Sequence, residues 1–197
     1  MRKAALITSL VLIANFASAE GDAERGKELA YTCLGCHGID GYRNAYPSFR
    51  VPKLGGQKAS YIVAAVKGYK NGERSHPTMI TQAASLSDQD LEDIAAYIAT
   101  LGAETVEAGG SKDVQPLDIA QTCVACHGEN GIGVAPIYPT IAGQHEDYLR
   151  YALKAYRDGE RTNVLMMPMA ANLTDAQINV LAEYYASMDG LETSKKE

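Results

Sequence analysis

Apolar side chains recur at helical spacing in two pairs of segments along the chain. The first pair carries them at Tyr61, Ile62, Ala65, Val66 and Tyr69, and again at Tyr148, Leu149, Ala152, Leu153 and Tyr156. The second pair carries them at Leu91, Ile94, Ala95, Ile98 and Leu101, and again at Ile178, Leu181, Ala182 and Tyr185. Shorter helical segments precede these, at residues 22–33 and 117–123. No stretch alternates apolar and polar residues convincingly, so the pattern predicts an all-α fold with three helical segments in each half.

The two halves are copies of one sequence. Residues 33–37 match residues 123–127 at an offset of 90, and residues 52–57, 67–74 and 86–88 match residues 139–144, 154–161 and 173–175 at an offset of 87. In both copies the last segment opens on a capping signal, Ser87 before Asp90 and Thr174 before Gln177. We therefore expect two domains, at residues 20–101 and 116–197. An exposed linker over residues 102–115 would join them, and residues 192–197 would form a frayed tail.

The first nineteen residues read as an export signal. Arg2 and Lys3 precede an almost wholly apolar run, and Ala17, Ser18 and Ala19 then fit a signal-peptidase site. The run is short for a membrane span, so we expect a periplasmic protein that starts near Glu20 and associates with the membrane at most peripherally. Without Arg2 and Lys3 the chain has 16 basic and 24 acidic residues, a net charge of −8. That balance argues against nucleic-acid binding.

All four cysteines of the chain lie in two Cys-x-x-Cys-His motifs. Two disulfides are the simplest reading for an exported protein, and a zinc site or thioredoxin-like redox pairs are others. A histidine after each pair, repeated in both copies, instead favours covalent attachment of two haem c groups. Their thioether bonds would form at Cys33, Cys36, Cys123 and Cys126, with His37 and His127 as axial ligands of the iron. A domain of about 80 residues has a marginal core, which a held haem would complete.

The second axial ligand is selected by the repeat. The candidates are His76, His145, Met79, Met166, Met167, Met169 and Met188. Neither histidine recurs in the other copy, so we expect both to be surface or loop residues. Met79 aligns with Met166 and is the favoured pair, while Met167 and Met169 remain alternatives in the second copy. A His/Met pair leaves no open position on the iron, which predicts an electron carrier with no catalytic residues.

Four polar residues recur in the two copies without an obvious structural need. They are Gln57, Arg74, Gln144 and Arg161. One interpretation is that they bind the carboxylates of the haems, and another is that they belong to a repeated turn between helices.

The whole mature chain resembles the dihaem cytochrome c4 family, which has tandem class I cytochrome c domains. The resemblance rests on the two Cys-x-x-Cys-His motifs, residues 52–57 and 139–144, Met79 and Met166, and residues 86–97. It implies two domains about a pseudo-twofold axis, with haem edges close together. It also implies that Pro52 and Pro139 accept a hydrogen bond from the haem-ligating histidines. Tyr97 and Tyr184 resemble the aromatic residue that packs against the first helix in this family. Gly26 would allow this close approach in the first copy. The second copy has Pro116 at the position equivalent to Gly26, which puts the same contact there in doubt.

The resemblance implies a periplasmic shuttle between redox proteins. Its partners would be a cytochrome bc complex, a haem-copper terminal oxidase or a flavoprotein. One alternative is a haem-bearing electron-transfer subunit of an enzyme such as a flavocytochrome sulfide dehydrogenase, and another is a dihaem enzyme with one open iron. The longer stretch at residues 41–51 departs from the family and is expected to alter the surface near the first haem.

Overall fold

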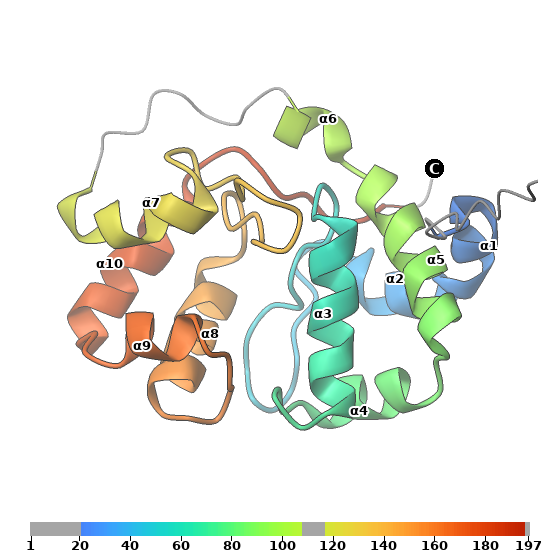
Figure 1. The fold of residues 1–197 in the computed structure, drawn as a ribbon, viewed down its shortest axis with the longest axis horizontal. Helices are drawn as coiled ribbons and strands as arrows, with labels where there is room; N and C mark the ends of the chain where they lie inside the picture. Colours follow the sequence, from blue (N-terminus) through green and yellow to red (C-terminus); the bar gives the residue numbers. More distant parts are fainter. Residues whose placement is uncertain (1–20, 108–116, 196–197) are drawn as a thin grey trace, which may run out of the picture.

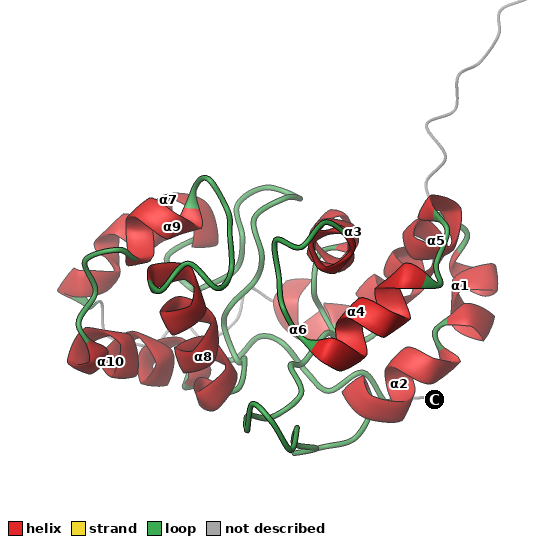
Figure 2. Ribbon diagram, turned by 90° about the horizontal axis from the view of Figure 1, so that it is seen from below, coloured by secondary structure: helices red, strands yellow, loops and turns green. Residues whose placement is uncertain are grey.

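Two helical lobes lie side by side in the computed structural model, which describes residues 21–107 and 117–195 (Figure 1). The first lobe contains α1 (Ala23–Leu29), α2 (Tyr31–His37), α3 (Ala59–Lys70), α4 (Pro77–Ala84) and α5 (Asp88–Thr100). The second contains η1 (Asp118–Ala120), α7 (Gln121–His127), α8 (Glu146–Arg157), α9 (Met166–Ala170) and α10 (Asp175–Ala186). Over the described residues Figure 2 shows helices and loops, and the β pairing is limited to two isolated bridges, Arg43 with Arg50 and Gly55 with Glu192. The all-α prediction is confirmed.

The repeat seen in the sequence is also a structural repeat. Helices α3 and α8 are each 12 residues long and begin 87 positions apart. Helices α5 and α10 both start with a complete capping box, in which the Ser87 or Thr174 hydroxyl accepts from the backbone N–H three residues on. The local sequence therefore sets the start of the last long helix in the same way in both copies.

Each copy has its own hydrophobic core. In the first copy the buried apolar residues come from α2, α3, α5 and Ala30 before α2, with α1 packed against them. In the second copy they come from η1, α8, α10 and the adjoining loops. Helices α1 and α5 approach closely at Gly26, where an added Cβ would overlap the Asp93 carbonyl and lie 3.0 Å from the Tyr97 Cβ. This confirms the contact expected between Gly26 and Tyr97. In the second copy Tyr184 packs edge-on against Tyr185, and Pro116 lies outside the described residues.

The first helical segment and the methionine segment differ from the prediction. Residues 22–33 form two helices, because the chain turns at Ala30 and α2 then continues through the whole of the first Cys-x-x-Cys-His motif. Each copy also has a further short helix. Helix α4 carries Met79 in the first copy, and α9 carries Met166 in the second. Three helical segments per copy was therefore too few, because these helices are too short to show a clear apolar period.

The predicted linker begins with a short helix. Helix α6 (Ala103–Glu107) occupies its first part, and Val106 Cγ2 lies 2.6 Å from where a Cβ of Gly56 would be. Residues 108–116, the rest of the predicted linker, lie outside the described residues, as do residues 1–20. Within the described residues, no helix is long and apolar enough to cross a membrane.

The expectation of a frayed tail was wrong for residues 192–195. Leu191 and Ser194 are buried, and Glu192 exchanges two backbone hydrogen bonds with Gly55 of the first copy. The chain end was expected to fray because terminal residues are poorly ordered unless something holds them. Its partner is the other copy, and the two come together only in the folded molecule.

The stretch at residues 41–51 packs on the second copy. Phe49 is 5 % exposed, and its ring stacks on Tyr151 of α8 at 4.4 Å between ring centroids. The Arg43 guanidinium pairs with the Asp147 carboxylate at 2.8 Å, and the Arg50 N–H donates to the same carboxylate at 3.1 Å. The three extra residues of the first copy therefore help to join the two lobes.

Candidate functional site

The two Cys-x-x-Cys-His motifs occupy equivalent helices. Residues 33–37 form the end of α2 and residues 123–127 the end of α7, so each cysteine pair lies on one helical turn. All four thiols are free, which does not support the two-disulfide reading. Burial raises the pKa of the Cys33 and Cys123 thiols. Within residues 21–107 and 117–195 no group of three or more His, Cys, Asp or Glu side chains could hold a metal ion, so the cysteines do not assemble a zinc site.

The two motif histidines are oriented by the same hydrogen bond. The His37 Nδ1 lies 2.8 Å from the Pro52 carbonyl oxygen, and the His127 Nδ1 lies 2.8 Å from the Pro139 carbonyl oxygen. Because a carbonyl only accepts, each Nδ1 carries the proton and each Nε2 keeps a lone pair for a metal. Burial lowers the pKa of both imidazoles, which favours the neutral, metal-binding form. The role inferred for Pro52 and Pro139 is confirmed.

The candidate methionines lie in different surroundings. Met79 lies on α4 and Met166 begins α9, and both are partly exposed. The Asn163 side chain accepts from the Met166 N–H at 3.0 Å, which fixes the start of that helix. Met188 is 3 % exposed inside the second core, which leaves it no access to an external group.

His76 lies in a loop, as one of the two expected placements had it, but it is buried and is not a surface residue. It precedes α4 with 9 % of its surface exposed, and its ring meets Phe49 edge-on at 6.0 Å. Phe49 belongs to the longer loop of the first copy, far from His76 in sequence. The residues next to His76 therefore do not predict that its ring is buried. His145 precedes α8 and is partly exposed, as expected of a loop residue.

The recurring glutamines join the two copies reciprocally. Gln57 accepts from the Thr140 N–H at 3.0 Å and donates to the Thr140 carbonyl at 2.9 Å. Gln144 makes the same pair of bonds with Lys53, each at 2.9 Å. Since Lys53 and Thr140 are themselves equivalent positions, the two pairs are related by a twofold axis between the copies. This agrees with the pseudo-twofold arrangement that the family resemblance implied.

The recurring arginines repeat this exchange with two tyrosines. The Arg74 Nη2 donates to the Tyr148 hydroxyl at 3.0 Å, and the Arg161 Nη2 donates to the Tyr61 hydroxyl at 3.1 Å. Each guanidinium also lies over a tyrosine ring of its own copy, Arg74 over Tyr69 and Arg161 over Tyr156. Burial by itself raises the pKa of Tyr61, but the two guanidiniums outweigh it and the net pKa is lowered.

Two sequence-level interpretations change here. The four recurring polar residues do not simply cap a turn, because they bind the opposite copy. Tyr61 and Tyr148 were assigned to apolar helix faces, yet their hydroxyls meet arginines across the interface. The sequence does contain a sign of this role. A helix core accepts many apolar residues, yet both copies have tyrosine at this position.

The interface arginines have no acidic partner in the part of the chain that the structure describes. Arg161 is 8 % exposed, and among the described residues neither Arg74 nor Arg161 forms an ion pair with a carboxylate. Leaving such a cation unpaired in the interior is unfavourable. The carboxylates of two haems would supply the missing negative charge, so the residues present fit this group.

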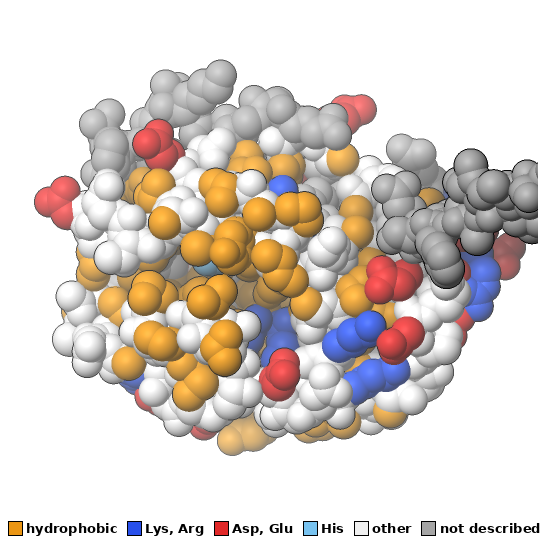
Figure 3. Space-filling model, viewed as in Figure 1, with side chains coloured by type: hydrophobic (Ala, Val, Ile, Leu, Met, Phe, Trp, Pro, Cys, Tyr) orange, Lys and Arg blue, Asp and Glu red, His pale blue; other side chains and the backbone are white. Residues whose placement is uncertain are grey.

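Apolar side chains gather on one face of the second lobe, around a hollow (Figure 3). The exposed apolar residues of this copy come mainly from the loop after α7 and from the segment around Met166, and include Val134, Ile137, Val164, Leu165 and Met169. The first copy has Pro77, Thr78 and Gln82 where the second has Val164, Leu165 and Met169. The two copies thus present chemically different surfaces near the candidate methionine ligands.

Comparison with known proteins identifies the domains. The family described as cytochrome c matches residues 23–102 and 115–189, one match for each copy. The chain is 35% identical over 196 residues to cytochrome c4 of Pseudomonas aeruginosa, covering 91% of this chain and 96% of that protein. It is 33% identical over 181 residues to a protein of Stutzerimonas stutzeri named thiosulfate dehydrogenase electron acceptor, covering 84% and 83% of the two chains.

The fold agrees with a solved structure. The crystal structure of reduced recombinant cytochrome c4 from Pseudomonas stutzeri superposes with a TM-score of 0.66 at 32% identity. The match covers 87% of this chain and all of that one. The likeness therefore extends over both lobes and their mutual arrangement.

Proposed function

Because the chain belongs to the cytochrome c family, and within it to the dihaem cytochrome c4 proteins, we propose that it shuttles electrons between redox proteins of the periplasm. The chain binds two covalent haem c groups, one at each Cys-x-x-Cys-His motif. A haem supplies a one-electron couple between ferric and ferrous iron. The observation that carries the proposal is the duplicated histidine site, in which the imidazoles of His37 and His127 are oriented identically.

The protein's own residues would hold this couple in place and tune it. Cys33, Cys36, Cys123 and Cys126 form the thioether bonds that fix the porphyrin on α2 and α7. His37 with Met79 would hold the iron of the first haem, and His127 with Met166 would hold the iron of the second. Such saturation favours electron transfer over catalysis, because no position is left for a substrate. The reciprocal glutamine and arginine contacts hold the two sites in a constant relation, which suits transfer between them.

The partner surface is proposed to lie on the apolar face of the second copy, the one around Val164 and Leu165. Donor and acceptor would be proteins such as a cytochrome bc complex and a haem-copper oxidase. The acidic net charge of the mature chain would steer encounter with basic partners, and the apolar face would then make the contact. The signal read in residues 1–19 supports export to the periplasm.

Spectroscopy and haem counting test the function. We expect purified protein from cells that mature cytochromes to contain two haems per chain, each low-spin and six-coordinate in both oxidation states. We expect it to exchange electrons rapidly with an oxidase and to bind no carbon monoxide when reduced. Rapid carbon monoxide binding by the wild-type protein would instead favour an enzyme with an open iron.

A second candidate is electron acceptance from one dedicated enzyme. The Stutzerimonas stutzeri relative is named as the electron acceptor of a thiosulfate dehydrogenase. The chain also matches 40% of a thiosulfate dehydrogenase from Marichromatium purpuratum, at 29% identity. Co-purification with a dehydrogenase, whether a haem protein or a flavoprotein, in fixed stoichiometry would favour this role. A chain that purifies alone and is reduced by several donors would favour the free shuttle.

Arg74 is expected to raise the reduction potential of the first-domain haem. Burial lowers the pKa of His37 most and Arg74 lowers it further, which places the guanidinium's positive field at the haem ligand. Charges roughly 10 Å apart at an effective dielectric constant of about 20 interact by about 1.7 kcal/mol. Arg74→Leu should therefore favour the oxidised haem about 20-fold at fixed potential. Redox titration checks this, with Arg74→Lys, which keeps the charge, as the control. Equal reduction potentials in both variants and the parent protein would show that Arg74 does not affect the first-domain haem.

A further inference from the structure

The last described residues of the second copy cross to the first copy. We call residues 191–195 the C-terminal strap; it leaves the second lobe after α10 and ends beside the first (Figure 1). The Leu191 N–H donates to the Ala142 carbonyl of its own copy at 2.8 Å. The next residue, Glu192, donates to the Gly55 carbonyl at 3.0 Å and accepts from the Gly55 N–H at 2.9 Å. Gly55 and Ala142 are equivalent positions of the repeat, so the strap bonds both copies at the same place.

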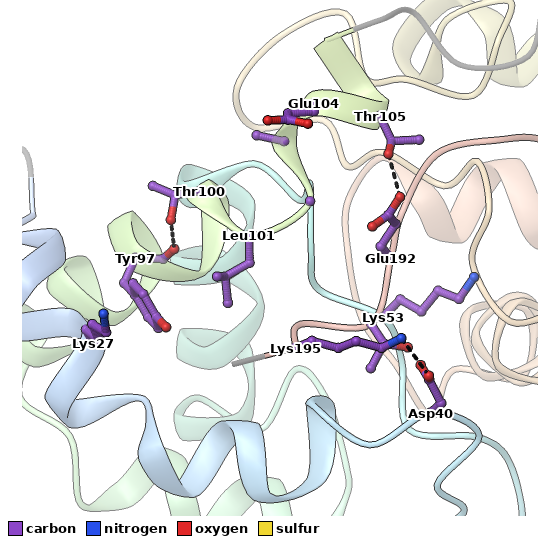
Figure 4. A pocket seen from close by; sticks show the side chains of 13 residues that line it. Lys27, Asp40, Lys53, Tyr97, Thr100, Leu101, Glu104, Thr105, Glu192 and Lys195 are labelled. Carbon is purple, nitrogen blue, oxygen red and sulfur yellow. Dashed lines mark hydrogen bonds and ion pairs between the residues drawn. The ribbon is translucent and has the colours of Figure 1, made fainter. Parts of the chain in front are cut away.

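The strap is seated rather than lying loosely on the surface. Leu191 is 2 % exposed and Ser194 is fully buried. Glycines make room for it, since a Cβ at Gly55 would lie 2.9 Å from the Glu192 carbonyl oxygen. A Cβ at Gly38 would likewise lie 2.9 Å from the Ser194 carbonyl oxygen. The outer edge of the strap lines a polar hollow, where Lys195 reaches Asp40 and Glu192 meets Thr105 (Figure 4). These exposed pairs contribute little, so the buried backbone contacts define the seat.

Two residues of the strap, Glu192 and Ser194, make backbone contacts with the first copy near His37. The Ser194 N–H donates to the His37 carbonyl at 3.3 Å. Glu192 holds Gly55, which follows Pro52 by three residues, and the Pro52 carbonyl accepts from the His37 imidazole. On the proline side the two copies are alike, because Leu191 bonds Ala142 three residues after Pro139; the Ser194 bond to His37 is the contact that differs. In the second copy the end of α7 is held by its own loop, through the Val134 N–H to the Cys126 carbonyl at 3.0 Å.

We propose that the C-terminal strap is a positioning element for His37 and thereby sets the reduction potential of the first-domain haem separately from the second. The inference rests on the proposed role of His37 as axial ligand. Groups that hold a metal-ligating histidine fix its ring orientation and its basicity, and both alter the metal site. The second copy supplies the Ser194 bond to the His37 carbonyl, and among the described residues no backbone N–H makes an equivalent bond to the His127 carbonyl.

The test is a matched pair of substitutions at Ser194 in the full chain. Ser194→Pro removes the N–H that bonds His37, whereas Ser194→Ala keeps it and deletes only a hydroxyl that has no hydrogen-bond partner. We expect Ser194→Pro to shift the reduction potential of the first-domain haem and to leave that of the second-domain haem unchanged. Ser194→Ala should reproduce both parent potentials. The readout is a redox titration with the two haems resolved by their paramagnetic proton shifts.

Further outcomes keep the test decisive. If Ser194→Pro does not accumulate with two haems, a chain ending at Leu191 replaces it, with the same expected shift. Unchanged potentials in a folded, dihaem variant lacking these contacts would overturn the proposal, as would equal shifts at both haems. Failure of the axial assignment looks different, because His37→Ala would then leave the first-domain haem six-coordinate and low-spin.

Discussion

Replacing Cys123 and Cys126 together by alanine is expected to leave one covalent haem per chain and to destabilise the second domain strongly. Both cysteines lie on one turn of α7, beside a core whose large apolar side chains are few. Without the thioether bonds the porphyrin is free to leave, and a domain of about 80 residues loses a large part of its apolar interior. The unpartnered charge of Arg161 would then add to the loss of stability.

Mass spectrometry of the denatured chain and a pyridine haemochrome assay measure this effect. The mass should fall by one haem beyond the change in side chains, and the haem absorbance per chain should halve. Replacing Cys33 and Cys36 by alanine is the matched variant, and it should remove the other haem. A double variant at Cys123 and Cys126 that retains two covalent haems would contradict the assignment.

Replacing Met166 by alanine is expected to open one iron of the reduced protein to carbon monoxide. An alanine side chain cannot reach a haem iron, so the axial position passes to water or an external ligand. We expect one carbon monoxide per chain where the parent binds none, and a lower potential for that haem because thioether sulfur stabilises ferrous iron. Met79→Ala should produce the same change at the other haem.

The neighbouring methionines provide the controls for this assignment. Met167 is half-buried and Met169 is 53 % exposed, both close to Met166 in sequence. Met167→Ala and Met169→Ala should leave the reduced protein closed to carbon monoxide. Binding in either variant, with none in Met166→Ala, would transfer the ligand role to that residue. Optical spectra before and after gas addition distinguish these outcomes.

The haem-binding motif could be predicted because its chemistry is local. Two cysteines two residues apart and an adjacent histidine lie on a single helical turn whatever surrounds them. The starts of the last long helices were equally predictable, since Ser87 and Thr174 bond the backbone three residues away. Duplication added a second constraint, because an essential position must recur, and this singled out Met79 and Met166.

The binding partners of the recurring glutamines and arginines could not be predicted from the sequence. Their recurrence marked them as important, but a turn, a haem carboxylate and the other copy are equal explanations at that level. Gln57 finds its partner 83 residues away at Thr140, and Arg161 finds Tyr61 at a separation of 100 residues. A contact between copies exists only after each has folded and the two have docked.

The sequence by itself determined two haem-binding helical domains, the place of a histidine beside each cysteine pair and the starts of their last long helices, because short-range bonds within one segment dictate each of these. Tertiary structure alone decided that the recurring polar residues bind across the copies, that Phe49 buries His76 and that the C-terminal strap braces His37. These features depend on surfaces that meet through the packing of two folded units. No periodicity or spacing within one segment encodes which surface will lie opposite another.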